Sequence, residues 1–536
     1  MVRKINRRQF LRGVGGAGAA AAVGWLHPVN AEGGQGVFRF AASGQPRSLD
    51  PAHTITTGDS LARTWANGLL RFKPGSGDPT DFEMDLATKW DVSNGGKTYT
   101  FQIRKGVQIH GGKGELTSAD VKWTFDRMKD KKLRSMNRGR YVNIDGIETP
   151  DRYTVRFHLK ELDGLFLNKM LNYRGGYIVA KVGVKDDLGL KMRWSPPLAT
   201  GPFMIKKFEP KVKIILERHD QYFRGRPRIK RYEYYFIRSI HTRILSLKKG
   251  ELDASYVGTL PRRLLETLKA DPNIEVDIPD SAYNSTLHFN LTMKPMDDKR
   301  VRQAIAYAIN RKEIVNLFAP MARPLYGPVA PICVGGLQVN EVPEKYRYTY
   351  NPEKAKALLK EAGYGSGLRL ETIAGAAIPH VAKPLEVIQQ HLAQVGIQLK
   401  IHTSDTPGYL KGSRGDKYPV NIYGGKRFPH AYDYLLEWYH TRSDVTKPTR
   451  MTNISRYGAV GRNVDKLIDE AGRISDKKRQ VELLKKAQFQ ILEDLPTYPL
   501  FTPLLGIARR KNVDLGFKFS DTSVYNYPLT EKSVSA

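Results

Sequence analysis

Cysteine is almost absent from this chain of 536 residues, which contains only Cys333. A disulfide needs two cysteines, so no bridge within the chain can stabilise the fold. The first 31 residues hold no cysteine, which excludes lipid attachment through one there. Stability must therefore come from buried apolar cores.

Common catalytic and metal-binding patterns are also missing. The sequence has no G-x-S-x-G, no H-E-x-x-H and no C-x-x-C motif. His380, His391 and His402 are eleven residues apart, which is not the spacing of a helical metal-binding pair. The sequence places no identifiable base beside Cys333, so we interpret it as a buried thiol. We expect no enzymatic activity, no metal site and no cofactor.

Long hydrophobic runs are limited to Gly13–Leu26, which at 14 residues is short of the ~20 needed to span a bilayer. Arg7 and Arg8 precede this stretch, and the small residues of Val29-Asn30-Ala31 follow it. A basic start, a short apolar middle and a small-residue cleavage site are the three parts of an export leader. Paired arginines are typical of the twin-arginine type. Residues 1–31 are predicted to be a signal peptide, removed from a soluble periplasmic protein.

Negative charge is scarce, with 54 Asp and Glu against 86 Lys and Arg and a net charge of +32. The leader contributes five of these cations and no acid, leaving +27. Acids are interleaved with the cations, as between Lys207 and Arg231, and no basic tail is present. Nucleic-acid binding is therefore not expected. A generally basic proteome, or attraction to an anionic membrane or ligand, remains open.

About 505 residues follow the leader, more than a single core of about 250–300 residues accommodates, so we expect two or more folding units. Strands are predicted by alternation of apolar and polar residues, and helices by apolar spacing of three and four. The predicted strands are 36–42, 97–107, 153–159, 212–216, 232–237 and 397–401. The predicted helices follow Thr117 (with Asp120 in a capping box) and Asp297 or Asp298, and cover 351–363, 385–395, 464–471 and 479–492. This mixture predicts an α/β or α+β protein.

Six short segments are each weak evidence of kinship when taken alone, but together and in this order they are specific to one protein family. They are Leu49-Asp50-Pro51 with Asn67-Gly68-Leu69-Leu70; 86–121, the most diagnostic; Thr200-Gly201-Pro202-Phe203 through Gly250-Glu251-Leu252-Asp253; Phe289-Asn290 through Ile309-Asn310-Arg311; Tyr350-Asn351-Pro352 to Gly363-Tyr364; and Pro496-Thr497-Tyr498-Pro499-Leu500. In this order the chain resembles the large extracytoplasmic solute-binding proteins of ABC transporters, the peptide/opine/nickel family, family 5. The resemblance covers most of the chain after the leader.

The resemblance implies an α/β fold of the two-lobed periplasmic binding protein type (type II, large class), with an extra subdomain on the first lobe. Mapped onto this chain, the first lobe covers 32–285, the second 286–496, and 497–536 return to the first. Ligand would be captured between lobes that close by a hinge motion. The protein would then be a monomer that delivers a peptide or a peptide-like or anionic solute to the permease subunits in the inner membrane.

The resemblance also places a ligand pocket. Dipeptide-binding relatives carry an aspartate there that pairs with the peptide ammonium, and Arg427 takes its place in this chain, two residues after Gly425 and close to Tyr423. If Arg427 faces the cleft, its planar fork suits a carboxylate or phosphate; if it faces solvent, it is an ordinary surface arginine. Lys383 is a weaker candidate of the same type, and Asp433 could supply a displaced acid. Position alone adds the loop residues Ser43 and Gly44 and the aromatics Tyr173 and Tyr177, for which core packing is the competing interpretation.

Two other classes of function compete with transport. Twin-arginine export often carries cofactor-loaded oxidoreductases, so an exported enzyme is the second candidate. A surface or nucleic-acid adhesion protein driven by its positive charge is the third. A bound chromophore would favour the enzyme, and steeply salt-dependent DNA binding would favour the adhesion protein.

Overall fold

The computed structural model describes residues 36–54, 57–183, 198–376, 378–425, 428–447, 452–520 and 526–535. The leader predicted at 1–31 and the candidate Arg427 lie outside the described residues. Within these ranges, none of the helices combines the length and the apolar character that a bilayer crossing requires. Gly36–Ala536 form one compact unit.

The largest sheet has seven strands, and its centre is β1 (Val37–Ala42). It lies parallel to β10 (Arg231–Phe236) on one side and to β11 (Ala254–Gly258) on the other. The remaining neighbours pair antiparallel, in the order β12-β19-β11-β1-β10-β9-β8. Their bounds are β8 Phe203–Glu209, β9 Lys213–Arg218, β12 Ile274–Asp277 and β19 Gly506–Arg510. The strands predicted at 36–42, 212–216 and 232–237 are confirmed.

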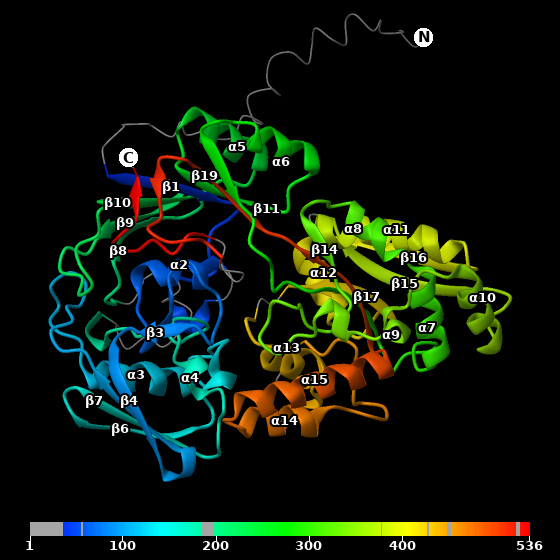
Figure 1. Ribbon diagram of the computed structural model, residues 1–536, viewed down its shortest axis with the longest axis horizontal. Coiled ribbons are helices and arrows are strands. Elements are labelled where there is room, and N and C mark those ends of the chain that lie inside the picture. Colours follow the sequence, from blue (N-terminus) through cyan, green and yellow to red (C-terminus); the bar gives the residue numbers. More distant parts are fainter. Residues whose placement is uncertain are drawn as a thin grey trace, which may run out of the picture. The chain divides into compact units, whose positions relative to one another are not determined.

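Alternation along β1 gives this sheet two apolar faces. Phe38 and Phe40 are fully buried in one core, opposite Tyr232 and Tyr234 of β10. Ala41 points into the other core, where α5 (Ile240–Lys249) and α6 (Arg262–Lys269) lie against β11 and β12 (Figure 1). Side chains of successive strand residues alternate between faces, which is why one strand serves both cores.

A second, antiparallel sheet is built from residues 87–159, in the order β4-β5-β7-β6. Its strands are β4 Ala87–Ser93, β5 Thr98–Ile103, β6 Ile144–Asp151 and β7 Thr154–Leu159. Helix α3 (Ser118–Lys129) packs on β6 and β7. The Asp120 carboxylate accepts the Thr117 N–H at 2.9 Å, so the predicted capping box is confirmed. Shorter elements nearby are α2 Thr57–Trp65, β2 Leu70–Phe72, β3 Phe82–Met84 and α4 Phe166–Lys169.

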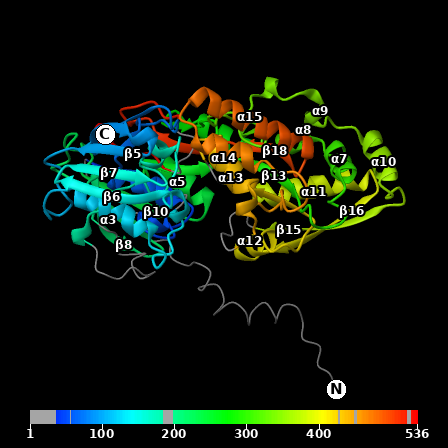
Figure 2. The ribbon, with the colours of Figure 1, turned by 90° about the horizontal axis from the view of Figure 1, so that it is seen from below.

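Residues 285–503 carry a four-stranded sheet, β14-β18-β13-β17, and the parallel pair β15–β16. The pair lies against α11 and α12, whereas α7 packs on α10 (Figure 2). The strands are β13 Ser285–Phe289, β14 Ala322–Pro324, β15 Leu368–Gly375, β16 Ile397–Ser404, β17 Val420–Gly424 and β18 Thr497–Pro503. The helices are α7 Lys299–Ala308, α8 Arg311–Asn316, α9 Glu344–Arg347, α10 Pro352–Glu361, α11 Pro379–Ala393, α12 Thr406–Ser413, α13 Ala431–Trp438, α14 Asp465–Arg473 and α15 Lys477–Asp494.

Helix starts in this part follow their caps. The Asn351 side chain accepts the Lys354 N–H at 2.9 Å and Pro352 is in the first turn, as predicted for α10. The helix predicted at 385–395 starts earlier, at Pro379, so that boundary was wrong. Pro384 lies inside α11, near its start.

The largest apolar core of this part extends from Ala282 to Phe501. Leu337, Val342 and Leu492 form a small second cluster, and Met321 packs into the core of α5 and α6. Strand β18 pairs with β13 and β14, so the chain re-enters the seven-stranded sheet only at β19. The mixed α/β fold class predicted from the sequence is confirmed. The division into lobes at 285 and 496 stays a prediction.

Candidate functional site

Oppositely charged side chains from segments far apart in the sequence meet at α13. Arg140 Nη1 lies 3.1 Å from Asp433 Oδ1, and Arg174 Nη2 lies 3.6 Å from Glu437 Oε1. Asp433 and Glu437 are four residues apart on a helix, so they share one face. The Arg174 guanidinium also lies over the Phe428 ring, 5.1 Å from its centroid.

Behind the arginines is a buried acid, Asp59 of α2. Its Oδ1 accepts the backbone N–H of Arg174 at 2.8 Å, and its backbone carbonyl accepts the Tyr177 hydroxyl at 2.6 Å. Burial raises the pKa of Asp59 to about 6, against the opposing charges of Arg63 and the neighbouring arginines. We name Asp59, Arg63, Arg140, Arg174, Asp433 and Glu437 the charged cluster.

Two arginines of this cluster have a hydrogen-bond donor that is not used by any described residue. Among the described residues, the buried Nε atoms of Arg140 and Arg174 have no hydrogen-bond partner. Burial acts to lower the pKa of Arg140, but Asp433, Tyr141 and Tyr173 together outweigh it and the pKa is raised. Arg140 therefore stays fully charged. A guanidinium with a spare N–H beside an ion pair is suited to a planar anion such as a carboxylate.

The structure brings three of the residues considered from the sequence to this cluster. Asp433 is part of it, Tyr177 anchors Asp59, and the Tyr173 ring lies 5.9 Å from the Arg63 guanidinium and 6.0 Å from that of Arg140. Tyr173 and Tyr177 are both buried, so they contact the cluster from the interior of the protein.

The other candidates lie elsewhere. Ser43 and Gly44 are exposed just after β1, and Lys383 is exposed on α11. Tyr423 is buried in β17, and its hydroxyl accepts a hydrogen bond from Arg414. Gly425 has φ +122°, a backbone conformation that suits glycine, and its N–H donates to the Asn284 carbonyl at 3.3 Å. The role of all these residues in ligand binding stays a prediction.

The glycine pair at the end of β17 makes room for an aromatic side chain. A Cβ on Gly424 would lie 2.8 Å from the Tyr283 ring, and one on Gly425 would lie 3.8 Å from its hydroxyl oxygen. That hydroxyl lies 2.7 Å from Nε2 of His380, at the start of α11. Tyr283 and His380 thus form a polar wall beside the predicted pocket, which the sequence analysis missed.

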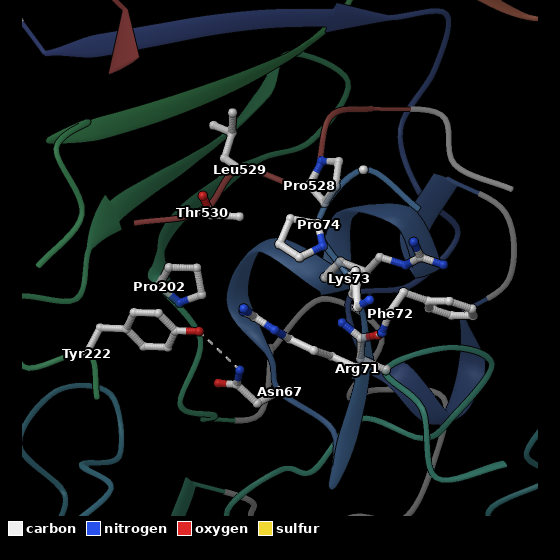
Figure 3. Close-up of a pocket in the computed structure, with 13 residues that line it drawn as sticks. Asn67, Arg71, Phe72, Lys73, Pro74, Pro202, Tyr222, Pro528, Leu529 and Thr530 are labelled. Atoms are coloured by element: carbon white, nitrogen blue, oxygen red, sulfur yellow. Dashed lines mark hydrogen bonds between the residues drawn. The ribbon is translucent and has the colours of Figure 1, made fainter. Parts of the chain in front are cut away.

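A small pocket opens inside the first part of the chain (Figure 3). Its lining residues come from the α2–β2 region, from Asn172, Pro202 and Tyr222, and from Pro528-Leu529-Thr530. They bond to each other and their neighbours: Asn67 donates to the Tyr222 hydroxyl at 3.3 Å, and Arg71 pairs with Glu83 at 2.5 Å. Two of the polar lining residues are therefore paired within the first part of the chain, and Arg63 of the charged cluster also lines the pocket.

Neither metal nor thiol chemistry has support in the described part of the chain. No group of three or more His, Cys, Asp or Glu side chains is arranged there to hold a metal ion. Cys333 is buried, its thiol donates to the Phe428 carbonyl at 3.2 Å, and burial raises its pKa. A thiol that stays protonated is a poor nucleophile.

Comparison with known families identifies the family of the chain. The model of the bacterial extracellular solute-binding proteins, family 5 (middle region), matches residues 81–445. The chain belongs to this family. A twin-arginine translocation signal matches residues 4–24, so the predicted leader is confirmed and this family 5 protein is exported to the periplasm.

Family 5 relatives with assigned ligands are similar over nearly the whole chain. Di/tripeptide-binding protein 1 of Pseudomonas aeruginosa is 28% identical, over 88% of this chain and 90% of its own. The dipeptide-binding protein of Escherichia coli is also 28% identical, over 85% and 87%. Among solved structures, MoaA of A. tumefaciens R10 in complex with mannopinic acid has a TM-score of 0.82 at 30% identity, covering 94% of this chain and all of its own.

Proposed function

We propose that this family 5 protein captures a peptide, or a peptide-like or anionic small solute, and delivers it to the permease of an ABC importer without altering it. The charged cluster is the observation that supports this best. It joins Arg140 and Arg174 to side chains of α13 from a separately cored part of the chain. The matching family and the relatives compared with this chain are binding proteins rather than enzymes.

The cores and sheets support a division into two lobes, which is part of the proposal. Our proposal assigns 36–284 to the first lobe and 285–503 to the second, and returns the chain to the first lobe at β19. The second crossing then lies at Leu504–Leu505, eight residues after the position expected from the sequence, because β18 pairs with β13. The monomeric state and the permease partner also belong to this proposal.

Names of relatives indicate the class of solute. Peptides are bound by the relatives from P. aeruginosa and E. coli, and mannopinic acid, an opine, by MoaA. Arg427 is proposed as an additional anion contact, because it follows Gly425 in the segment that carries the ammonium-binding aspartate of dipeptide-binding proteins. Arg427→Ala should then abolish binding of an anionic ligand, and unchanged affinity would remove Arg427 from the site.

A thermal-shift screen tests the function. The mature protein, residues 32–536, is mixed with dipeptides, longer peptides, opines, and anionic sugars or aromatics. A ligand at a hundred times its Kd stabilises the folded protein by about 2.7 kcal/mol, which raises the melting temperature measurably. A shift with peptides or opines supports the proposal; no shift with any class would contradict it.

A further inference from the structure

Positive charge is concentrated in the connection between β9 and β10, neighbouring strands of the seven-stranded sheet in Figure 1. Between Asp220 and Glu233 the sequence holds five Lys and Arg residues and no acid. We name residues 224–231, which contain all five, the basic loop. None of them belongs to the charged cluster, so the function proposed above leaves this loop without a role.

Inward-pointing side chains hold the basic loop on the rest of the protein. Tyr222, just before it, is buried. Arg224 Nε lies 3.3 Å from Oδ1 of the fully buried Asp85. Farther along, Pro227 and Ile229 are buried as well. The backbone of the loop is therefore fixed by packing, and its outward side chains project from a firm base.

Three cations make up the outward side of the loop. Burial alternates from residue 226 to residue 230, with Arg226, Arg228 and Lys230 exposed and the two residues between them buried. Alternate residues of an extended segment share one side, so these three side chains point the same way. At about 3.3 Å per residue, they form a row about 13 Å long.

The row has more positive charge than its acid neighbours can balance. Asp220 is shared by two arginines, with Oδ1 lying 2.6 Å from Nε of Arg226 and 2.8 Å from Nε of Arg218. Within the described residues, neither Arg228 nor Lys230 forms an ion pair. The Arg226 side chain is 61% exposed, and an exposed pair of this kind contributes little stability. All three cations are accessible to a partner.

An extended anionic surface fits this row better than a small solute does. The pocket of Figure 3 is lined by Tyr222 but by none of the three exposed cations. Basic segments are attracted to membranes that contain anionic lipids, within about a Debye length of ~10 Å. The net charge of +32, of which the leader accounts for five, has the sign that adds to this attraction. Export to the periplasm, which membranes enclose, favours a membrane over nucleic acid as the partner.

We propose that the basic loop docks the exported protein on the anionic phospholipid surface of the membrane. Arg226, Arg228 and Lys230 contact the lipid phosphates, to which a guanidinium can donate two parallel hydrogen bonds. Docking uses none of the charged cluster, so it goes beyond solute capture and does not depend on it. The protein is thereby held beside the membrane with or without a bound solute.

Two variants that lose the same charge separate the loop from the overall charge of the protein. The loop variant combines Arg226→Gln, Arg228→Gln and Lys230→Gln. The control variant combines Lys249→Gln, Arg262→Gln and Arg263→Gln, which remove three cations from exposed positions of α5 and α6. Circular dichroism and melting temperature confirm that each variant folds.

Binding is measured by sedimentation of the mature protein, residues 32–536, with lipid vesicles. The vesicles contain equal parts of phosphatidylglycerol and phosphatidylcholine, or phosphatidylcholine alone, at about 0.05 M and about 0.5 M sodium chloride. Each basic side chain near an anionic surface strengthens binding about fivefold. The loop variant should therefore bind the anionic vesicles at least about 20-fold more weakly than wild type, and the control variant within about threefold of it. Neutral vesicles and high salt should abolish binding by all three proteins.

Four results would overturn the inference. They are no binding of the wild-type protein to anionic vesicles, equal losses in the two variants, binding that persists at high salt, and tighter binding to double-stranded DNA than to vesicles with the same loss in the loop variant. Equal losses would assign the attraction to overall charge, and the DNA result would make nucleic acid the partner of the loop. None of these measurements contains a transported solute, so a failure here is distinct from a failure of the proposed function, which the thermal-shift screen measures.

Discussion

Two arginine–aspartate pairs of this molecule differ in their exposure to solvent. Arg127 of α3 contacts both oxygens of Asp50, with side-chain exposures of only 3% and 0%. Arg140 contacts Asp433 through one hydrogen bond at 3.1 Å, with exposures of 13% and 22%. The first pair joins segments of one part of the chain, and the second joins two parts. The pair within one part of the chain is sealed from solvent, whereas the pair that joins the two parts is partly exposed.

The largest expected effect comes from breaking the pair within the first part. Arg127→Gln leaves Asp50 buried without its counter-charge, which costs about 3–5 kcal/mol. Urea denaturation of the mature protein measures this loss. Ligand affinity of the folded variant should stay at the wild-type value, and a variant as stable as wild type would contradict the structural role.

The buried acid of the charged cluster gives an effect of opposite sign. The pKa of Asp59 is raised from 3.8 to about 6, so its ionisation destabilises the folded protein as the pH rises through that window. An asparagine side chain at this position would resemble the protonated form. Asp59→Asn is therefore expected to gain up to about 3 kcal/mol of unfolding free energy at pH 7.5.

Measuring the free energy of unfolding at a second pH controls for effects of Asp59→Asn that are unrelated to ionisation. At pH 4, where the wild-type carboxyl is largely protonated, Asp59→Asn and wild type should be nearly equal in stability. Asp145→Asn, at an exposed position in β6, should leave stability unchanged at both pH values. A destabilised Asp59→Asn at pH 7.5 would show that its charge supports the arginines more than burial penalises it.

In the acid range, buried histidines change the free energy of unfolding with pH in the direction opposite to Asp59. Burial lowers the pKa of His110 and His288 to about 3 and that of His430 to about 4. Above pH 6.5 the histidines are neutral in both the folded and the unfolded protein. As the pH falls below 6.5, the unfolded chain takes up protons that the folded protein cannot, so the free energy of unfolding decreases. Each should cost about 2 kcal/mol at pH 5 relative to pH 7, measured by guanidinium denaturation. Equal unfolding free energies at the two pH values would contradict this.

The smallest expected effect is at a backbone contact between the two parts. The Gly164 N–H donates to the Gly472 carbonyl at 2.9 Å, and a Cβ on Gly164 would lie 1.9 Å from the Ile474 carbonyl oxygen. Gly164→Ala must push these segments apart and should weaken ligand binding about tenfold, or about 1.4 kcal/mol. Gly146→Ala, which has open space around its Cβ, is the matched control.

Much of the fold could be predicted because local patterns and global contacts agree. Alternation at 36–42 and 232–237 reflects two strands that pair in register, and Thr117 with Asp120 forms the cap that its spacing indicates. Pro384 shows the limit. Apolar spacing did not reveal that α11 begins at Pro379, before the predicted start at 385, and runs through this proline.

The candidate site was less predictable because its members share no motif. Asp59 belongs to α2, Arg140 to the 3-10 helix Arg138–Arg140, Arg174 to a turn and Glu437 to α13. Each alone reads as an ordinary charged residue. Only Asp433 could be named, and only through the alignment of one short segment. Charge balance across a contact between distant segments is a property of the folded chain and is invisible in local sequence.

The central claim, that this family 5 protein captures a small solute, is tested most directly by thermal-shift titration of the mature protein, residues 32–536, with peptides, opines, and anionic sugars or aromatics. The account predicts a higher melting temperature with at least one of these classes. No shift with any of them would contradict it.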